Sequence, residues 1–156
     1  MSISPSPLPL QLGNAAAAIL LLEDGRYLLQ LRDDIPGIWY PGHWGLFGGG
    51  VEPNEDEVTA LRRELREEIG LDLVEDQAHL FTRFEFDLRP AGKERYFRSY
   101  YEVRIPTLIL PRLTLHEGAD MRAFSAEKAL ALRLSPYDGF ALLLHYQHAR
   151  FGSSCR

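Results

Sequence analysis

Residues 48–71 read GGGVEPNEDEVTALRRELREEIGL and carry the clearest structural signal in the chain. Apolar side chains recur in this stretch at the spacing of one helix face: Val58, Leu61, Leu65 and Ile69. The pattern predicts a helix over Glu55–Ile69 that buries this face against a core. Charged residues fill the remaining positions, as in a helix at the surface of a domain.

Both ends of this helix carry recognisable signals. Asn54 is predicted to be the N-cap, and Glu57, three residues later, would complete a capping box. Gly70 suits the left-handed residue that follows many helices. Upstream, Gly48-Gly49-Gly50 is expected to end a short strand over Gly45–Phe47 and to let the backbone approach a ligand or ion closely.

The acidic residues of this helix are arranged in an unfavourable way. Glu64, Glu67 and Glu68 are spaced i, i+3 and i+4, so that their side chains share one face. Glu67 and Glu68 also lie near the negative end of the helix dipole. Three carboxylates there call for a compensating charge, which Mg²⁺ commonly supplies beside phosphates. A solvated charged face is the alternative, but it would be expected to contain more favourable acid–base pairs.

The stretch resembles the Nudix box, G-x5-E-x7-R-E-U-x-E-E-x-G-U, where U is an aliphatic residue. Every defined position matches from Gly49 through Glu55 to Arg63-Glu64 and on to Leu71. Phe47 stands where the family often has proline, and Asn54 where it often has glycine. The resemblance implies a Mg²⁺-dependent hydrolase, with Mn²⁺ as a substitute, that cleaves a phosphoanhydride bond in a nucleoside diphosphate linked to another group.

The same resemblance implies roles for individual residues. Glu64, Glu67 and Glu68 would bind metal, and Glu64 would also be a candidate general base. Arg63 would orient these glutamates, and the carbonyl of Gly48 would join the metal ligands. Glu55 and Gly70 would be structural.

Outside the box, candidates follow from position in the chain. Arg32 ends a predicted strand where relatives often place a phosphate-binding arginine, and Glu117 lies where many carry a further acid. Glu117 could therefore be an extra metal ligand or the general base. Gly49, Phe47 and Trp44 are candidate substrate contacts. The aromatic cluster formed by Trp39, Tyr40 and Trp44 could stack on a base or cover the core.

The remaining pattern predicts a mixed sheet between helices. A hairpin is expected at Asp24-Gly25, between apolar runs. Further strands are expected over Leu80–Leu88, Tyr96–Ile105 and Met121–Phe124, and helices over 126–132 and from Ser135-Pro136 to about Arg150. The fold class expected is α/β of the α+β type, with the Nudix αβα sandwich.

Length and composition indicate the number of domains and the cellular compartment. The 156 residues suit one domain, expected over residues 13–151, with an irregular arm at 1–12 and a tail at 152–156. The net charge of −5 gives no basic footprint for a nucleic-acid polymer. The longest apolar run, Ala15–Leu22, is too short to span a membrane. The single cysteine, Cys155, favours a reducing, cytoplasmic setting, and a homodimer is a further expectation.

Two questions stay open at this level. The residues after the box match neither the ADP-ribose nor the dinucleoside polyphosphate pattern, so nucleoside triphosphates and nucleotide sugars remain as substrates. A Nudix-fold regulator that binds nucleotides without hydrolysing them is the alternative function. An isopentenyl diphosphate isomerase is disfavoured, because that chemistry resembles one needing an active-site cysteine and Cys155 lies in the tail.

Overall fold

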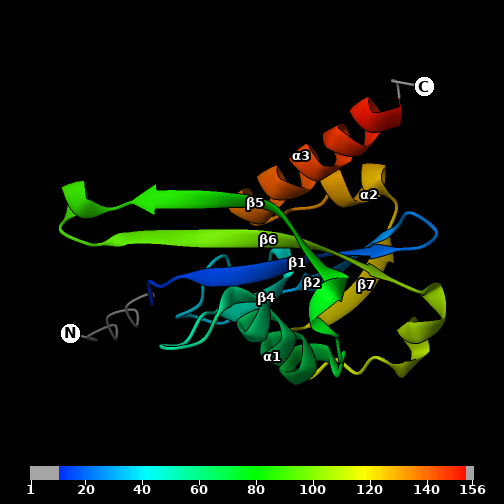
Figure 1. Cartoon of the computed structure of the whole chain (residues 1–156), viewed down its shortest axis with the longest axis horizontal. Coiled ribbons are helices and arrows are strands. Elements are labelled where there is room, and N and C mark those ends of the chain that lie inside the picture. Colours follow the sequence, from blue (N-terminus) through cyan, green and yellow to red (C-terminus); the bar gives the residue numbers. More distant parts are fainter. Residues whose placement is uncertain (1–10, 154–156) are drawn as a thin grey trace, which may run out of the picture.

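A computed structural model describes residues 11–153 of the chain, so most of the expected arm and tail, including Cys155, lies outside the described residues. A mixed sheet forms the centre of the structure (Figure 1). Its strands are β1 (Ala15–Leu22), β2 (Tyr27–Leu31), β3 (Trp44–Gly45), β4 (Phe47–Gly50), β5 (Ala78–Asp87), β6 (Arg95–Ile105) and β7 (Asp120–Phe124). The α-helices are α1 (Glu57–Ile69), α2 (Ala126–Leu130) and α3 (Pro136–Ser153). Short 3-10 turns cover Glu75–Gln77, Arg89–Ala91 and Thr107–Arg112.

The central strand of the sheet is β1. The main order is β3-β2-β1-β6-β5, with β4 also paired to β1 and β7 to β2. β1 runs parallel to β6 and antiparallel to β2 and β4. The expected hairpin between β1 and β2 is confirmed, with Leu20 opposite Leu28 and Gly25 at a φ of 87° in the turn.

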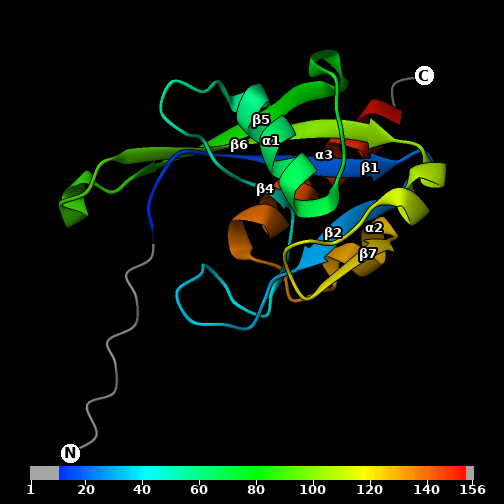
Figure 2. The same cartoon turned by 90° about the horizontal axis from the view of Figure 1, so that it is seen from below.

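Both faces of β1 are buried, which explains why its sequence is a continuous apolar run rather than an alternating one. Ala16, Ala18 and Leu20 belong to the core on the side of α1. Ala17 and Ile19 belong to a second core, which includes residues of α2 and α3. The helices therefore cover opposite faces of the sheet (Figures 1 and 2), and the expected αβα arrangement is confirmed.

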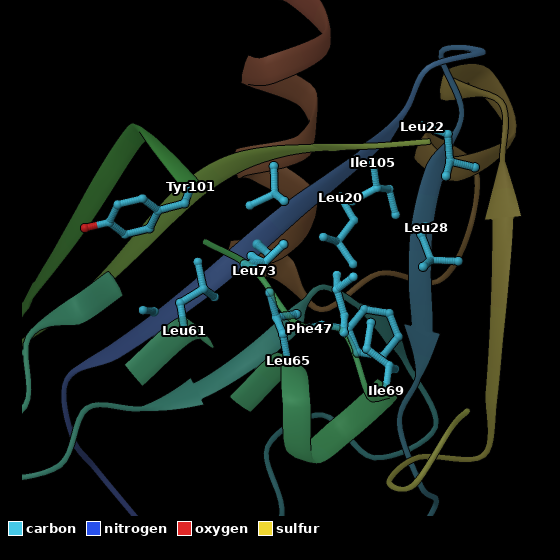
Figure 3. Close-up of a cluster of buried hydrophobic side chains, with 14 residues drawn as sticks. Leu20, Leu22, Leu28, Phe47, Leu61, Leu65, Ile69, Leu73, Tyr101 and Ile105 are labelled. Atoms are coloured by element: carbon cyan, nitrogen blue, oxygen red, sulfur yellow. The ribbon is translucent and has the colours of Figure 1, made fainter. Parts of the chain in front are cut away.

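The apolar face of α1 packs as its spacing predicts. Leu61, Leu65 and Ile69 are fully buried and point toward Phe47 and Leu20 from the sheet (Figure 3). Gly70 ends the helix at a φ of 67°, and its N–H donates to the carbonyls of Arg66 and Leu65. This packing fixes the rotation of α1 about its axis and so determines where its glutamates lie.

The start of α1 differs from the prediction. Asp56, not Asn54, is the N-cap: its carboxylate accepts a hydrogen bond of 2.8 Å from the N–H of Thr59. Asn54 takes a φ of 64°, in the left-handed region that asparagine tolerates better than most residues. The predicted capping box is therefore wrong. Glu57 instead reaches the sheet, where it accepts from the Tyr101 hydroxyl and pairs with Arg83.

The glycine run also differs from the prediction. The expected strand over Gly45–Phe47 is divided at Leu46, where the chain leaves β2 as its partner and joins β1. The Leu46 N–H donates to the Asp138 carboxylate rather than to a neighbouring strand. Gly48-Gly49-Gly50 belongs to β4 and is not a loop; Gly48 lies opposite Ala17.

Candidate metal and phosphate site

Glu68 is held against the sheet by a backbone donor. Its side chain leaves α1 toward β4, where the Gly48 N–H donates to Glu68 Oε2 over 2.9 Å. Glu68 is only 4% exposed. Gly48 adopts a φ of 138°, and a Cβ there would lie 2.2 Å from the carbonyl oxygen of Ala16, so only glycine fits.

Glu64 occupies the space beside the next glycine. A Cβ at Gly49 would lie 2.6 Å from the carboxyl carbon of Glu64, which shows how closely this carboxylate approaches β4. Arg63 Nη1 donates to Glu64 Oε1 over 2.8 Å. The half-buried Glu64 is thus positioned by the strand on one side and by its neighbour on the helix on the other.

Arg63 is the centre of a network around the acidic helix face. Its Nε and Nη2 donate to the two carboxylate oxygens of Glu55, each over 2.9 Å, and Nη2 also donates to the Gly50 carbonyl. This paired geometry is the strongest arrangement available to arginine and a carboxylate. Arg63 Nη1 also lies 3.5 Å from Glu67, whose side chain is 61% exposed. The geometry agrees with an orienting role for Arg63 and a structural role for Glu55.

A distant segment closes the C-terminal end of α1. The Thr114 N–H donates to the Ile69 carbonyl, and the His116 N–H donates to the Glu68 carbonyl over 2.8 Å. These bonds satisfy helix carbonyls that have no partner within the helix. They also bring Glu117 close enough to influence the pKa values of Glu64 and Glu68. The structure therefore brings Glu117 to the same site as the box glutamates.

The buried glutamine of β2 was not singled out from the sequence. Gln30 is 4% exposed, and its side-chain amide donates to the Glu117 carbonyl over 2.7 Å. The signal for it is a polar residue inside the apolar run YLLQL. Gln30 therefore anchors the segment that carries Glu117.

The electrostatics of the site favour a bound cation. Burial, together with the negative charges of Glu64 and Glu117, raises the pKa of Glu68 to about 8, despite the hydrogen bond from Gly48. Burial also raises the pKa of Glu64, although Arg63 opposes this shift. Within residues 11–153, no three acidic, histidine or cysteine side chains lie close enough to hold a metal as they stand. The oxygen donors nevertheless suit Mg²⁺, because a divalent cation would offset the repulsion between these carboxylates.

The predicted substrate contacts lie in different surroundings. Arg32 lies beyond the end of β2, where its Nε donates to the Trp39 carbonyl over 2.7 Å. Trp44 packs edge-on against Phe124 with ring centroids 5.0 Å apart and belongs to the core on the side of α3. Phe47 has no exposed surface. The structure therefore gives no geometric support to a substrate contact by the Phe47 ring, whereas Arg32 and Gly49 keep positions compatible with one.

Fold and site together define an α+β protein in which an acidic helix end faces a glycine-rich strand of a mixed sheet. The chain belongs to the NUDIX domain family, whose model matches residues 11–142. The expected family membership is thereby confirmed.

Similar proteins support this result. A segment of 70 residues is 47% identical to "Nucleoside triphosphatase NudI" of Escherichia coli O1:K1 / APEC; it makes up 45% of this chain and 48% of that relative. The match thus spans about half the length of this curated relative. A mutT/nudix family protein from Listeria innocua has the same fold, with a TM-score of 0.72, 22% identity, and coverage of 92% of this chain and 98% of that one. The MutT protein from Methanosarcina mazei Go1 also has this fold, with a TM-score of 0.69 and 22% identity; the match covers 86% of this chain and 93% of that one.

Proposed function

We propose that this protein is a Mg²⁺-dependent Nudix pyrophosphohydrolase that cleaves phosphoanhydride bonds in nucleoside triphosphates or other nucleoside diphosphate derivatives. The main support is the position of Glu68, which is buried, and Glu64, which is half-buried; both are held against Gly48 and Gly49 at the spacing of the family motif. The similarity to a nucleoside triphosphatase favours triphosphates among these substrates.

Four carboxylates and one carbonyl would hold the metal: those of Glu64, Glu67, Glu68 and Glu117, and the carbonyl of Gly48. When bound, Mg²⁺ supplies charge neutralisation of the phosphates and lowers the pKa of an attacking water. The Gly48 N–H keeps Glu68 in place, and Arg63 keeps Glu64 directed toward β4. Glu64 is suited to accept the water proton because burial raises its pKa toward neutrality. Glu117 is the second candidate for this role.

The test is a substrate panel of nucleoside triphosphates, nucleotide sugars and dinucleoside polyphosphates, each with Mg²⁺, with Mn²⁺ and with EDTA. We expect release of pyrophosphate or phosphate that EDTA abolishes. Glu68→Gln should lower kcat by roughly 10²- to 10⁴-fold with an unchanged circular dichroism spectrum. Glu94→Gln, which neutralises an exposed acid in the loop between β5 and β6, is the matched control and should keep wild-type activity.

Two outcomes would contradict the proposal. Full metal-dependent turnover by Glu68→Gln would remove this residue from the reaction. Inactivity of the wild type on the whole panel, combined with nucleotide binding, would favour the non-catalytic Nudix regulator. A cytoplasmic location and a homodimer remain predictions; within the described part of the chain, no helix has the length and apolar character needed to cross a bilayer.

A further inference from the structure

The loop between β2 and β3 lines an open cavity that shares no residue with the acidic site. Its volume is about 600 Å³, within the range of small-molecule sites. Three aromatic rings from the loop line it, those of Trp39, Tyr40 and His43, and Asp34 and Arg133 provide charge. The loop lies beside the first turn of α3 (Figure 2), where the Tyr40 and Tyr137 rings are 5.6 Å apart.

The backbone of Tyr40 is strained, and ring contacts surround its side chain. This residue has a φ of 47°, in a region that a bulky side chain rarely adopts. Such strain persists only where the surroundings enforce it, and it concentrates at ligand-binding sites. The enforcing contacts are edge-on rings of His43 at 5.5 Å and Tyr137 at 5.6 Å, and the bond from Arg32 to the Trp39 carbonyl.

The loop also leaves aromatic surface open to a ligand. Trp39 is 36% exposed, although its indole N–H is satisfied by the Gln11 carbonyl. Its ring centroid lies 6.5 Å from that of Tyr40, with the planes inclined by 35°. Exposed, fixed aromatic rings are the surfaces on which nucleobases stack. At the rim, Arg133 donates through Nε to His43 over 3.1 Å, which orients its guanidinium beside the rings.

Arg32 lies between the β2–β3 loop and β3. Its side chain runs past Gly45, where a Cβ would lie 3.9 Å from Arg32 Cδ, and ends on the Trp39 carbonyl. Gly48 lies three positions after Gly45, which is at most roughly 10 Å of chain. Gly48 holds Glu68. A nucleoside in the cavity could therefore extend its phosphates along Arg32 to the carboxylates.

Another cavity of comparable size is a poorer match for an anion. It has a volume of about 710 Å³ and lies against the start of α1, where four acids line it together with one arginine: Glu52, Glu55, Asp56, Glu57 and Arg83. This excess of carboxylates would repel a nucleotide, whereas the cavity of the β2–β3 loop is lined by one acid, Asp34, and one arginine, Arg133, and has Arg32 on the Trp39 carbonyl beside it.

We propose that the β2–β3 loop cavity binds the nucleobase of the substrate by stacking against Tyr40 and Trp39, and so determines which nucleotides are accepted. This inference rests on the proposed function in one respect, the assumption that the substrate is a nucleotide. It adds a specificity site formed by residues outside the Nudix box.

The experiment measures binding of nucleoside monophosphates and of ribose 5-phosphate to the full chain by titration calorimetry, in EDTA so that no turnover occurs. Ribose 5-phosphate has the same phosphate and sugar but no base. We expect at least one nucleoside monophosphate to bind ten-fold or more tightly than ribose 5-phosphate, on the order of the gain from stacking one base. Tyr40→Leu should reduce this preference to less than three-fold, and Trp39→Ala, at a more exposed position, should weaken it.

Ile35→Ala is the matched control, since Ile35 is 51% exposed in the same loop and does not line the cavity; it should keep the full preference. Equal binding of ribose 5-phosphate and every nucleoside monophosphate to the wild type would overturn the proposal. So would a preference that survives in folded Tyr40→Leu and Trp39→Ala proteins. Wild-type inactivity on the nucleotide panel would count only against hydrolysis, because base binding is measured without it.

Discussion

Adding a single methyl group at Gly49 tests whether the position of the Glu64 carboxylate matters for activity. A methyl group at this position would lie 2.6–2.7 Å from the Glu64 carboxylate, which must then move away from β4. We expect Gly49→Ala to fold, because the group that must yield is the end of a flexible side chain. Its kcat should fall by roughly 10- to 100-fold, the usual effect of displacing a positioned group by about 1 Å. Steady-state kinetics with Mg²⁺ and thermal unfolding measure both effects.

The adjacent glycine provides the control. At Gly50 the nearest atom to an added Cβ is the Asn14 carbonyl oxygen at 3.9 Å, an ordinary contact. Gly50→Ala should therefore keep activity within about two-fold of the wild type. If both substitutions lowered kcat equally, the effect would come from stiffening of β4 and not from the position of Glu64.

Glu102 makes folding stability depend on pH through a contact remote from the site. His145 Nε2 lies 2.6 Å from Glu102 Oε2, and Nδ1 of the same ring lies 2.8 Å from the Tyr27 hydroxyl. Burial alone would raise the pKa of Glu102, but the hydrogen bonds from His145 and Arg104 lower it below its ordinary 4.5. A lowered pKa means that the ionised group stabilises the fold above pH 4.5 and that this contribution is lost as the pH falls through the folded-state pKa.

Unfolding in urea between pH 7 and pH 3 tests this expectation. Glu102→Gln should be less stable than the wild type at pH 7, and the difference should shrink below pH 4.5. Glu85→Gln, an exposed position on β5, is the control and should show a smaller difference at pH 7. A gap between wild type and Glu102→Gln that widened on acidification would have the wrong sign for a lowered pKa.

At the scale of elements, the start of α1 offers the sharpest test. Asp56 caps the helix through Thr59, whereas Asn54 only occupies a left-handed backbone position. Asp56→Ala should cost about 1 kcal/mol of unfolding free energy. Asn54→Gly should be neutral or slightly stabilising, because glycine adopts a positive φ without strain. If chemical denaturation showed that Asn54→Gly loses more unfolding free energy than Asp56→Ala, Asn54 would be the N-cap.

The two ends of α1 show which part of an element a sequence can reveal. The apolar face and the Gly70 terminus follow from spacing and backbone preference, both of which are local. The predicted N-cap was wrong because asparagine and aspartate are both good caps. Only the path of the preceding loop determines whether Asn54 or Asp56 takes this position. The division of β3 from β4 at Leu46 depends on Asp138, which is 92 residues away. No local pattern contains that information.

At the scale of the whole molecule, the acidic site is assembled from segments far apart in the chain. The motif alone indicated Glu64 and Glu68, since one helix turn brings them together. Glu117 joins them because Thr114 and His116 bond to the end of α1, and because Gln30 holds the Glu117 carbonyl. Its inclusion in the sequence-based hypothesis came from position in the family and not from a physical signal in the chain. The aromatic cluster of this loop was recognised from the sequence, but its cavity is completed by Arg133, which lies beyond β7, and the Tyr40 ring packs on Tyr137.

One buried ion pair joins α3 to the sheet. Asp138 of α3, 3% exposed, accepts from Arg98 of β6 over 3.0 Å, from the Tyr100 hydroxyl over 3.1 Å and from the Leu46 N–H over 3.0 Å. Asp138→Ala should destabilise the protein by about 3–5 kcal/mol, because it leaves a buried guanidinium without its partner. Thermal and urea unfolding measure this loss.

A double variant that removes both charges of the Arg98–Asp138 pair tests whether the unpaired guanidinium causes the loss of stability. Arg98→Met combined with Asp138→Ala should be more stable than Asp138→Ala alone, because no unpaired buried charge remains. Arg104→Ala, which breaks an exposed pair with Glu102, should cost at most about 1 kcal/mol. Asp138 also binds the Leu46 N–H, directly before β4, and so holds β4 relative to α3. If Asp138→Ala lost no more unfolding free energy than Arg104→Ala, the Arg98–Asp138 pair would not be responsible for this placement. The position of Gly48 beneath Glu68 would then depend on the pairing of β4 with β1 alone.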